Sequence, residues 1–433
     1  MDKKSKQFLF DYLNNASPTG FEHTGQQIWL DYIRPYTHDY MVDTYGTAVG
    51  VVNPKEKYKV VIEAHADEIS WFVNYITPEG YIYVRRNGGS DHQIAPSMRV
   101  NIHTEKGIVK GVFGWPAIHV RDHNKEEAPT LKNIFIDIGC ESKKEVESLG
   151  VHVGCVITFE DELIELNKNY ITGRALDNRM GGFMIAEVAR RLKENKKQLP
   201  FCLYIVNSVQ EEIGLRGAEM ISRRLKPDLA ICTDVTHDTG SPMYNKKESG
   251  DLKCGDGPVL CYGPAVQNNV LRTIIKIAEK KKIPFQRQAV SRSTGTDTDS
   301  FAYSAEGVAS ALISLPLKYM HTTVETVHKQ DIENVIKLIY EVLLNLKPGE
   351  DYRYIKEPGS NVWRPRSGHF KPHGPQIFPK TRIGFVDHLR GFDFQIHKGS
   401  PGGKAHGHPV VVIGADLDLP FWGFPRGKGK NAR

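Results

Sequence analysis

The first 70 residues show two amphipathic segments followed by short apolar ones. Phe8, Tyr12 and Leu13 recur at the spacing of one helical face, which predicts a helix near the N-terminus. A second helix is expected after the turn SPTGFE, and two apolar strands follow, GTAVGVVNP and YKVVIEAH. We therefore expect the chain to begin with two helices and two strands.

Between about residues 71 and 164 the pattern changes to short runs of alternating apolar and polar positions. Six runs are separated by turns rich in Gly, Asn, Pro and charged residues: WFVNYIT, YIYVRR, MRVNIHT, GIVKGVFG, IFIDIG and CVITFE. Only KKEVESLG has the pattern of a short helix. Short strands at this spacing indicate a small β-barrel or sandwich. We therefore expect an inserted β domain at 71–164.

From about residue 165 apolar strands alternate with amphipathic helices. The strands are FCLYIVNSV, DLAICTDV and VASALISLP, and the helices include MGGFMIAEVARRLKEN and, last, DIENVIKLIYEVLLNL. This alternation predicts a mainly parallel sheet covered by helices on both faces. The predicted fold class is α/β, with a mainly parallel sheet flanked by helices. Its catalytic domain is expected at 1–70 and 165–355, interrupted by the β domain.

The basic excess of the chain lies in its last part. Residues 356–433 carry 13 Lys and Arg against 5 Asp and Glu, whereas residues 1–355 carry 44 against 46. The last part also holds 13 Gly and 9 Pro, so we expect a Gly/Pro/His-rich basic tail outside the fold. The HGH run at 406–408 is better explained by this tail than by a metal site. The near-neutral body has no basic stripe, so we expect no nucleic-acid partner.

Other features of the sequence bear on location. It contains no run of about 18 apolar residues, so no membrane span is expected. The N-terminal MDKKSKQFLFDYLNN is interrupted by Asp11 and lacks a cleavage site, which favours an amphipathic helix over a signal peptide. The 6 cysteines form no C-x-x-C pair. We expect reduced core thiols in a cytoplasmic protein.

Acids and histidines follow several of the predicted strands, where α/β sheets bind ligands. In VVIEAHADEI, His65 and Asp67 lie two residues apart at a strand end and point to the same side. His65 can bind a metal while Asp67 accepts its other ring N–H. In GRALDNRMGG, Asp177 lies in a polar turn before a helix. It could bridge two metal ions, or simply cap that helix.

Two adjacent carboxylates, Glu211 and Glu212, end the strand in IVNSVQEEIG. Adjacent side chains on a strand point in opposed directions, so one carboxylate can bind a metal while the other faces a substrate water. Like charges side by side are costly unless cations are near. Asp234 ends the apolar strand in LAICTDV, and His321 follows a strand and opens a helix. His237 and Asp238 lie further into a loop and are expected to have structural or supporting roles.

Together these positions supply two imidazoles and three carboxylates: His65, Asp177, Glu212, Asp234 and His321. With one hydroxide, four negative charges balance two divalent ions, which suits a co-catalytic metal pair. Nitrogen and oxygen ligands without thiolate fit Zn, Co or Mn. We expect two divalent metal ions per chain, Zn or Co.

The order H-x-D, ALDNR, EEIG, TD and MHTT-x-E resembles that of the co-catalytic metallopeptidases, and more narrowly that of the tetrahedral (TET) and glutamyl aminopeptidases. The match covers about residues 5–355 and depends on HADEI, GRALDNR, QEEIGLRGA and the IDIG…GVHVGC run together. In related carboxypeptidase-like and aminoacylase enzymes the extra domain is inserted later, before the last histidine. Here the long gap lies between His65 and Asp177, which favours the TET-like branch.

The resemblance implies a zinc-peptidase-like fold and a metal-dependent aminopeptidase that removes N-terminal residues from peptides. It implies that Asp67 and Glu211 are catalytic, that the other five residues are metal ligands, and that Asp177 is the bridge. It further implies that the inserted β domain assembles dimers into a hollow dodecamer. The loop STGTDTDSF at 293–301 would lie near the substrate pocket. The basic tail departs from the family and leaves normal assembly open.

Three other functions remain open at this stage. An N-acyl amino acid or amide hydrolase could use the same site, and free and blocked aminoacyl substrates would separate the two. A glycoside hydrolase needs two opposed carboxylates and no metal pair. A non-catalytic scaffold would not need a complete set of ligands and base. Loss of activity with a chelator would separate a metallopeptidase from the last two.

Overall fold

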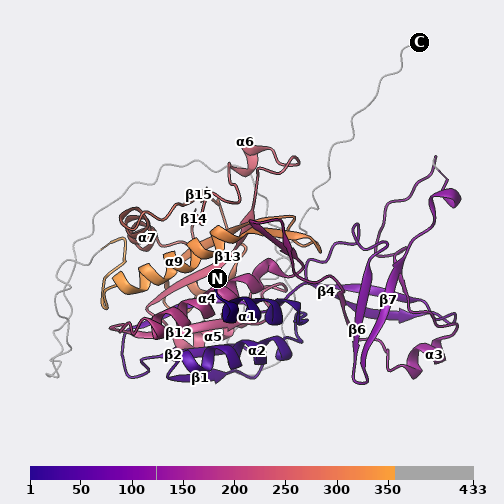
Figure 1. Cartoon of the computed structure of the whole chain (residues 1–433), viewed down its shortest axis with the longest axis horizontal. Helices are drawn as coiled ribbons and strands as arrows, with labels where there is room; N and C mark the ends of the chain where they lie inside the picture. Colours follow the sequence, from indigo (N-terminus) through magenta and orange to yellow (C-terminus); the bar gives the residue numbers. More distant parts are fainter. Residues whose placement is uncertain (123, 356–433) are drawn as a thin grey trace, which may run out of the picture. The chain divides into compact units, whose positions relative to one another are not determined.

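The computed structural model of the chain describes residues 1–122 and 124–355. It contains a mostly parallel sheet flanked by helices and a closed antiparallel barrel (Figure 1), which confirms the predicted α/β fold class with an inserted barrel. The Gly/Pro/His-rich tail predicted at 356–433, with its HGH run, lies outside the described residues.

Within the described residues, one sheet of 11 strands forms the α/β domain. At its centre, neighbouring strands β12, β3, β13 and β16 pair in parallel, and antiparallel partners extend the sheet on both sides. Residues 60–65 of β3 are all buried, as expected for a parallel strand covered on both faces. In spatial order the strands are β1 (Asp39–Val42), β2 (Ala48–Val52), β12 (Cys202–Ser208), β3 (Lys59–His65), β13 (Leu229–His237), β16 (Ala309–Lys318), β17 (Glu325–His328), β11 (Tyr170–Gly173) and β10 (Ile164–Leu166), with β14 (Val259–Tyr262) joining β16 and β15 (Gln286–Ala289) joining β14.

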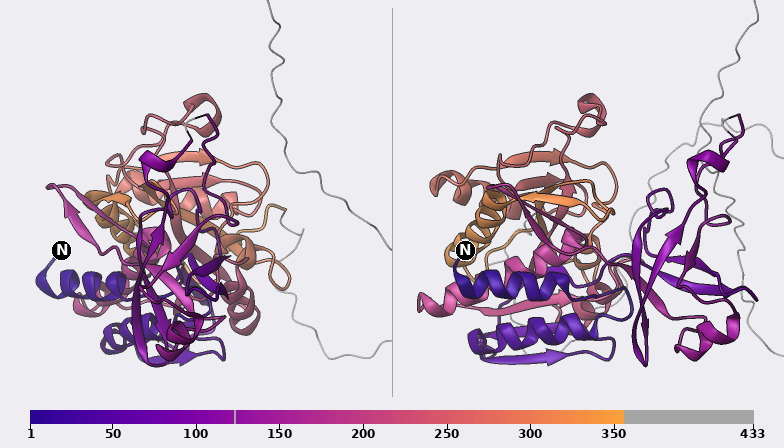
Figure 2. Two further views of the ribbon diagram at one scale, coloured as in Figure 1. Left: turned by 90° about the vertical axis from the view of Figure 1, so that its right-hand side faces the viewer. Right: turned by 45° about the vertical axis from the view of Figure 1, so that its right-hand side comes forward.

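The helices pack on this sheet in two groups. In the first, α4 lies against β3 and is flanked by α1, α2 and α9, with α1 and α2 side by side (Figure 2). In the second, α5 and α8 pack together near β12 and β13. The predicted stripe of α1 is buried, because Phe8, Tyr12 and Leu13 face the core. The helices are α1 (Lys3–Asn14), α2 (His23–Ile33), α4 (Leu176–Glu194), α5 (Arg216–Leu225), α6 (Lys246–Ser249), α7 (Asn268–Lys280), α8 (Asp297–Ala302) and α9 (Lys329–Asn345), with single 3-10 turns at Arg34–Tyr36 and Ile118–Val120.

Each of the six alternating runs forms one strand of the barrel. The strands close in the order β4 (Ser70–Ile76), β5 (Ile82–Asn87), β8 (Phe135–Asp137), β7 (Gly107–Gly114), β6 (Arg99–Thr104) and β9 (Val156–Phe159). Alternate side chains fill a separate core that includes Trp71, Ile102 and Phe113. The predicted short helix is α3 (Lys143–Ser148).

The prediction missed several strands of the sheet edges. The first 70 residues hold three strands, because β1 precedes the two that were expected. β10 and β15 were also missed, since β10 has three exposed residues and β15 has the polar sequence QRQA. Three residues are too few for the alternation of β10 to be recognised, and β15 has no apolar alternation. Such strands form because a neighbouring strand supplies their hydrogen bonds.

The parallel register brings the carboxyl ends of the central strands together. Ser208, at the end of β12, pairs with His65, at the end of β3, and β13 lies on the other side of β3. Side chains that follow these strands therefore meet at one edge of the sheet.

Among the described residues, no helix is long and apolar enough to span a membrane. All 6 cysteines are free.

Candidate metal centre

His65 lies between two carboxylates at the end of β3. Its Nδ1 is 3.3 Å from Oδ1 of Asp67, and its Nε2 is 3.2 Å from Oδ1 of Asp177. His65 and Asp67 are almost fully buried, at 1% and 0% exposure. The H-x-D spacing places Asp67 beside Nδ1, and Asp177, from a distant segment, lies beside Nε2. A carboxylate beside Nδ1 can orient the ring and make Nε2 a better ligand.

Asp177 contacts both histidines of the predicted set, each through a different oxygen. Its Oδ1 is 3.2 Å from Nε2 of His65, and its Oδ2 is 3.4 Å from Nε2 of His321. Its φ and ψ are not helical although it lies in the first turn of α4, as predicted for a polar turn before a helix. A carboxylate with one oxygen directed to each imidazole has the geometry that a bridging ligand requires.

Glu211 and Glu212 do not end a strand, which corrects the prediction for this pair. β12 stops at Ser208, and Gln210 adopts a left-handed φ of 59°. The two glutamates lie in the following loop, which Asp67 holds by accepting backbone N–H groups of Glu211 at 3.0 Å and Glu212 at 3.2 Å. Asp67 therefore fixes this loop as well as His65.

The two glutamate carboxylates still diverge, as was predicted. Oε2 of Glu211 lies 3.8 Å from Nε2 of His65, whereas Oε2 of Glu212 lies 3.5 Å from Nε2 of His321. The cause is the conformation of the loop, not strand alternation. One carboxylate is thereby placed beside each imidazole.

The local structures around Asp234 and His321 differ from the prediction. Asp234 does not end its strand, because β13 continues to His237. The predicted helix after His321 is wrong: His321 lies in a turn with a φ of 61°, and strand β17 follows at Glu325. β17 forms because it pairs with β11 and β16, and β11 lies about 150 residues earlier in the chain. Asp238 is structural, since it accepts backbone N–H groups of Gly240 and Cys254.

Burial makes most of these carboxylates difficult to ionise. Burial and the neighbouring acids raise the pKa of Glu211 to about 10 and that of Asp234 to about 8. Asp177 is different: burial opposes its ionisation, but hydrogen bonds from His321 and His65 hold its pKa below the ordinary range. Crowded carboxylates of this kind are stabilised as anions by a nearby cation.

The donor set fits divalent metal ions. His65, Asp177 and Glu212 each offer one ligand atom within 4.8 Å of the others, and so do His65, Glu211 and Asp234. These atoms are nitrogen and oxygen, without sulfur, which suits borderline or hard divalent cations. The two groups share His65, so these five residues form one cluster of possible ligand atoms.

Sequence reasoning missed three residues that support this cluster. Glu325 is buried and accepts the backbone N–H of His321 at 2.7 Å and of Asp177 at 3.1 Å. Thr19 donates to Asp67, and Glu22 accepts the backbone N–H of Gln210 at 3.2 Å. Glu325 is the last residue of MHTT-x-E and could have been suspected there. Thr19 and Glu22 lie in a turn whose sequence indicates no chemistry.

A cavity of about 480 Å³ opens beside the cluster. The predicted site residues that line it are Asp177, Glu211, Glu212, Asp234 and His321. The loop that was expected near the substrate pocket also lines it, through residues 293–296 and Asp299. The remaining wall includes Leu215, Thr236, Gln288 and Met320.

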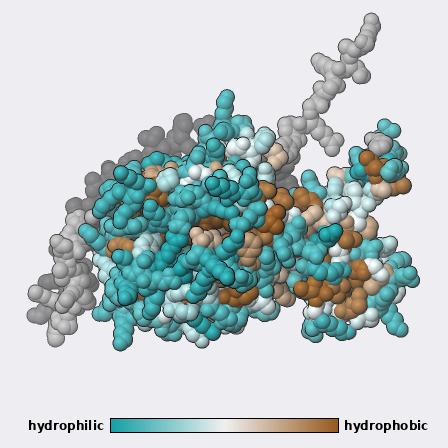
Figure 3. All heavy atoms as spheres, viewed as in Figure 1, coloured by the Kyte–Doolittle hydropathy of each residue, from teal (hydrophilic) through white to brown (hydrophobic). Residues whose placement is uncertain are grey.

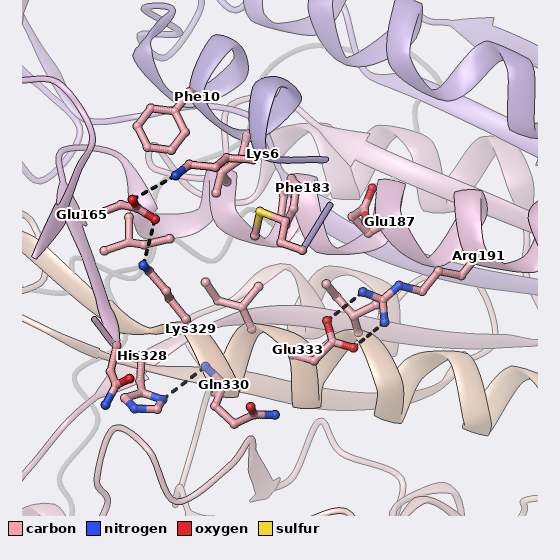
Figure 4. A pocket seen from close by; sticks show the side chains of 16 residues that line it. Lys6, Phe10, Glu165, Phe183, Glu187, Arg191, His328, Lys329, Gln330 and Glu333 are labelled. Atoms are coloured by element: carbon pink, nitrogen blue, oxygen red, sulfur yellow. Dashed lines mark hydrogen bonds and ion pairs between the residues drawn. The ribbon is translucent and has the colours of Figure 1, made fainter. Parts of the chain in front are cut away.

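A second cavity, of about 470 Å³, lies between α1, α4 and α9 (Figure 4). Lys6 and Lys329 both bind Glu165 on one side of it, and Arg191 binds Glu333 on another. The seven predicted site residues do not line it. It is therefore separate from the candidate metal centre.

The chain is similar to known aminopeptidases along most of its length. A sequence model of the M42 glutamyl aminopeptidase family matches residues 46–338. Lysyl aminopeptidase of Pyrococcus furiosus is 32% identical over 339 residues, covering 78% of this chain and 96% of the relative. Among solved structures, a TET aminopeptidase from a marine sediment Thaumarchaeota archaeon has a TM-score of 0.76 and 29% identity, covering 79% of this chain and 96% of that one. The Pyrococcus horikoshii TET1 peptidase, described as able to assemble into a tetrahedron or a large octahedral shell, has a TM-score of 0.71 and 29% identity, with 79% and 100% covered.

Proposed function

Because the chain belongs to the M42 glutamyl aminopeptidase family, we propose that it removes N-terminal residues from peptides at a dinuclear metal centre. Family membership makes it a peptide hydrolase of the metallopeptidase class. The number of metal ions, their ligands and the identity of the base are our proposal. We expect the metal to be Zn or Co, as the nitrogen and oxygen donors suggest.

The observation that carries the proposal is the position of Asp177 between two histidines. Its two oxygens lie 3.2 Å from His65 and 3.4 Å from His321, so one carboxylate can serve two ions. His65 and Asp234 would complete the ligands of one ion. Glu212, 3.5 Å from His321, would complete those of the other together with that histidine. When bound, the two ions would polarise the scissile carbonyl and lower the pKa of the attacking water.

Glu211 is the proposed general base. Its carboxylate lies 3.8 Å from His65 and lines the cavity beside the cluster, where a substrate can reach it. It would take a proton from the attacking water and return it to the leaving amine. Burial first and then neighbouring acids raise the pKa of Glu211 to about 10, and bound cations nearby would lower it. Asp67 supports the base by holding its backbone N–H at 3.0 Å.

The free N-terminus of the peptide is proposed to bind at the cluster itself. An ammonium group can pair with an acid there, and its amine form can approach an ion, so the scissile bond nearest the chain end is placed beside Glu211. The side chain of the first residue would enter the cavity lined by the 293–296 loop, Leu215 and Met320.

A panel of free and blocked substrates tests this function. We expect hydrolysis of aminoacyl p-nitroanilides and of short peptides with a free N-terminus. The N-acetylated forms of the same substrates should be cleaved at least roughly 100-fold more slowly, as expected when buried polar groups lose their partner. Preference for the acetylated forms would instead identify an N-acyl amide hydrolase. Cleavage of cellulose oligomers without metal would identify a glycoside hydrolase, the other alternative.

We further propose that the chain associates with itself through the barrel, as dimers that build a dodecamer. Apolar surface gathers over the barrel in Figure 3. Exposed apolar side chains of the barrel segment include Ile108, Val112 and Val153, each at least 45% exposed. Exposed patches of this kind commonly mark interfaces. Sedimentation at micromolar concentration tests assembly, and a monomer throughout would contradict it.

Cytoplasmic location remains a prediction, supported by the 6 free cysteines.

A further inference from the structure

A bend that follows strand β5 of the barrel lies against the candidate metal centre. Strand β5 ends at Asn87, and Gly88 and Gly89 follow it. The backbone of Gly89 lies directly against the ring of His321, since a Cβ atom added to Gly89 would meet that ring. The inserted barrel, whose expected role is assembly, thus packs its backbone against a residue of the site.

Both glycines lie close against site residues, and at Gly89 the distance leaves no room for a side chain. A Cβ atom added to Gly89 would lie 2.6 Å from Nδ1 and 2.7 Å from Cε1 of His321. One added to Gly88 would lie 3.2 Å from Cβ of Glu212, and Gly88 also has a φ of 75°. Glycine permits such close approach of backbone to a neighbouring group. The turn therefore contacts His321 and Glu212, the two residues grouped at one side of Asp177.

Hydrogen bonds hold this turn to the α/β domain. The side chain of Asn87 donates to the carbonyl of Thr19 at 2.8 Å and to the hydroxyl of Ser70 at 2.8 Å. The hydroxyl of Thr19 in turn donates to Asp67 at 2.9 Å. A continuous set of contacts thereby runs from the end of a barrel strand to the residue that orients His65.

We propose that Gly89 is a positioning residue for His321 and that the barrel is thereby a structural part of one half of the metal centre. This inference rests on the proposed function, because it takes His321 and Glu212 as ligands of one ion. Gly89 packs against the Nδ1 side of the His321 ring, while Nε2 faces Asp177 and Glu212. Fixing one ring nitrogen orients the other for a metal. None of the three atoms nearest to a Cβ added at Gly88 or Gly89 belongs to His65 or Asp234.

The test is Gly89→Ala in the full chain, compared with Gly114→Ala. The φ of Gly89 is not positive, so alanine suits the backbone and its methyl group meets His321. Gly114 is a matched control: it lies in the same barrel, also has no positive φ, and its added Cβ would lie 2.6 Å from the ring of Phe135. Metal content per chain is measured after dialysis against graded free Zn²⁺, with a melting curve for each variant.

We expect Gly89→Ala to bind one ion normally and the second roughly 10- to 100-fold more weakly, the usual cost of losing a supporting partner of a ligand. High free metal should restore the second ion and much of the activity. Gly114→Ala should keep two ions at wild-type affinity, even if its melting temperature falls. Equal affinities in wild type and Gly89→Ala, or the same loss in Gly114→Ala, would overturn the inference.

A second variant covers the case in which Gly89→Ala does not fold. Asn87→Ala removes the bonds to Thr19 and Ser70 without adding any atom near His321. It loosens the turn that carries Gly89 and should weaken the second ion in the same direction, and an unchanged affinity for the second ion would count against the inference. Because Thr19 also donates to Asp67, the affinity for the first ion is measured alongside. If wild-type protein itself binds fewer than two ions, the proposed dinuclear function fails independently of Gly89.

Discussion

Glu325→Gln is expected to weaken metal binding although Glu325 is not a proposed ligand. The carboxylate uses both oxygens: Oε1 accepts the N–H of His321 at 2.7 Å and Oε2 accepts the N–H of Asp177 at 3.1 Å. Glutamine has only one acceptor oxygen, so its NH₂ group must face one of these N–H donors. Glu325 is 2% exposed, and water has little access to repair the loss.

The magnitude follows from the number of bonds lost. One buried N–H without a partner costs about 1–3 kcal/mol. Without metal the turn at His321 can relax and recover part of this, whereas bound metal requires both ligand segments in place. The cost should therefore appear as a roughly 5- to 150-fold loss of metal affinity, at about 1.4 kcal/mol for each factor of ten.

Competition with a chelator of known affinity measures this loss. Glu333→Gln is the control, because Glu333 pairs with Arg191 beside the second cavity and does not contact the metal centre. We expect Glu333→Gln to bind metal as the wild type does. Equal metal affinity in the two variants would refute the reasoning, and so would a loss of activity in Glu325→Gln with metal affinity unchanged.

Two further predictions concern acids in and beside the metal centre. Glu211→Gln should keep both ions and lose roughly 10²–10⁴-fold in kcat, whereas Glu212→Gln should lose metal. If metal analysis showed the reverse pattern, Glu212 would be the base and Glu211 the ligand. Burial, followed by the charge of Asp67, raises the pKa of Glu22 from 4.5 to about 8, so the folded state holds a proton that the unfolded state releases. The contribution of Glu22 to the stability of the fold is therefore present below about pH 4.5 and lost as the pH rises to about 8. Glu22→Gln should flatten this fall in a pH series of melting temperatures. An unchanged slope would contradict the assignment to Glu22.

Most elements could be predicted where the apolar pattern is local. The six barrel strands and the helix stripe of α1 follow from alternation and helical spacing within single segments. The pairing of His65 with Asp67 also follows from local spacing, because two residues at a strand end share a side. These features need no information from distant parts of the chain.

The errors arise where a distant segment determines the local structure. The sequence after His321 has threonines suited to a helix start, but β17 forms because β11 pairs with it. The loop of Glu211 and Glu212 is shaped by Asp67, about 145 residues earlier. The contribution of Gly89 could not be read from sequence, since a glycine has no side chain to indicate chemistry and its contact with His321 exists only in the folded chain.

Stepwise metal reconstitution of chelated protein tests the dinuclear mechanism most directly. The protein is stripped by chelation, its fold is checked by circular dichroism, and Zn²⁺ or Co²⁺ is added while aminopeptidase activity and bound metal are measured together. We expect the stripped protein to be folded and inactive and to regain full activity at two ions per chain. Full activity after exhaustive chelation, with no metal detected by elemental analysis, would contradict it.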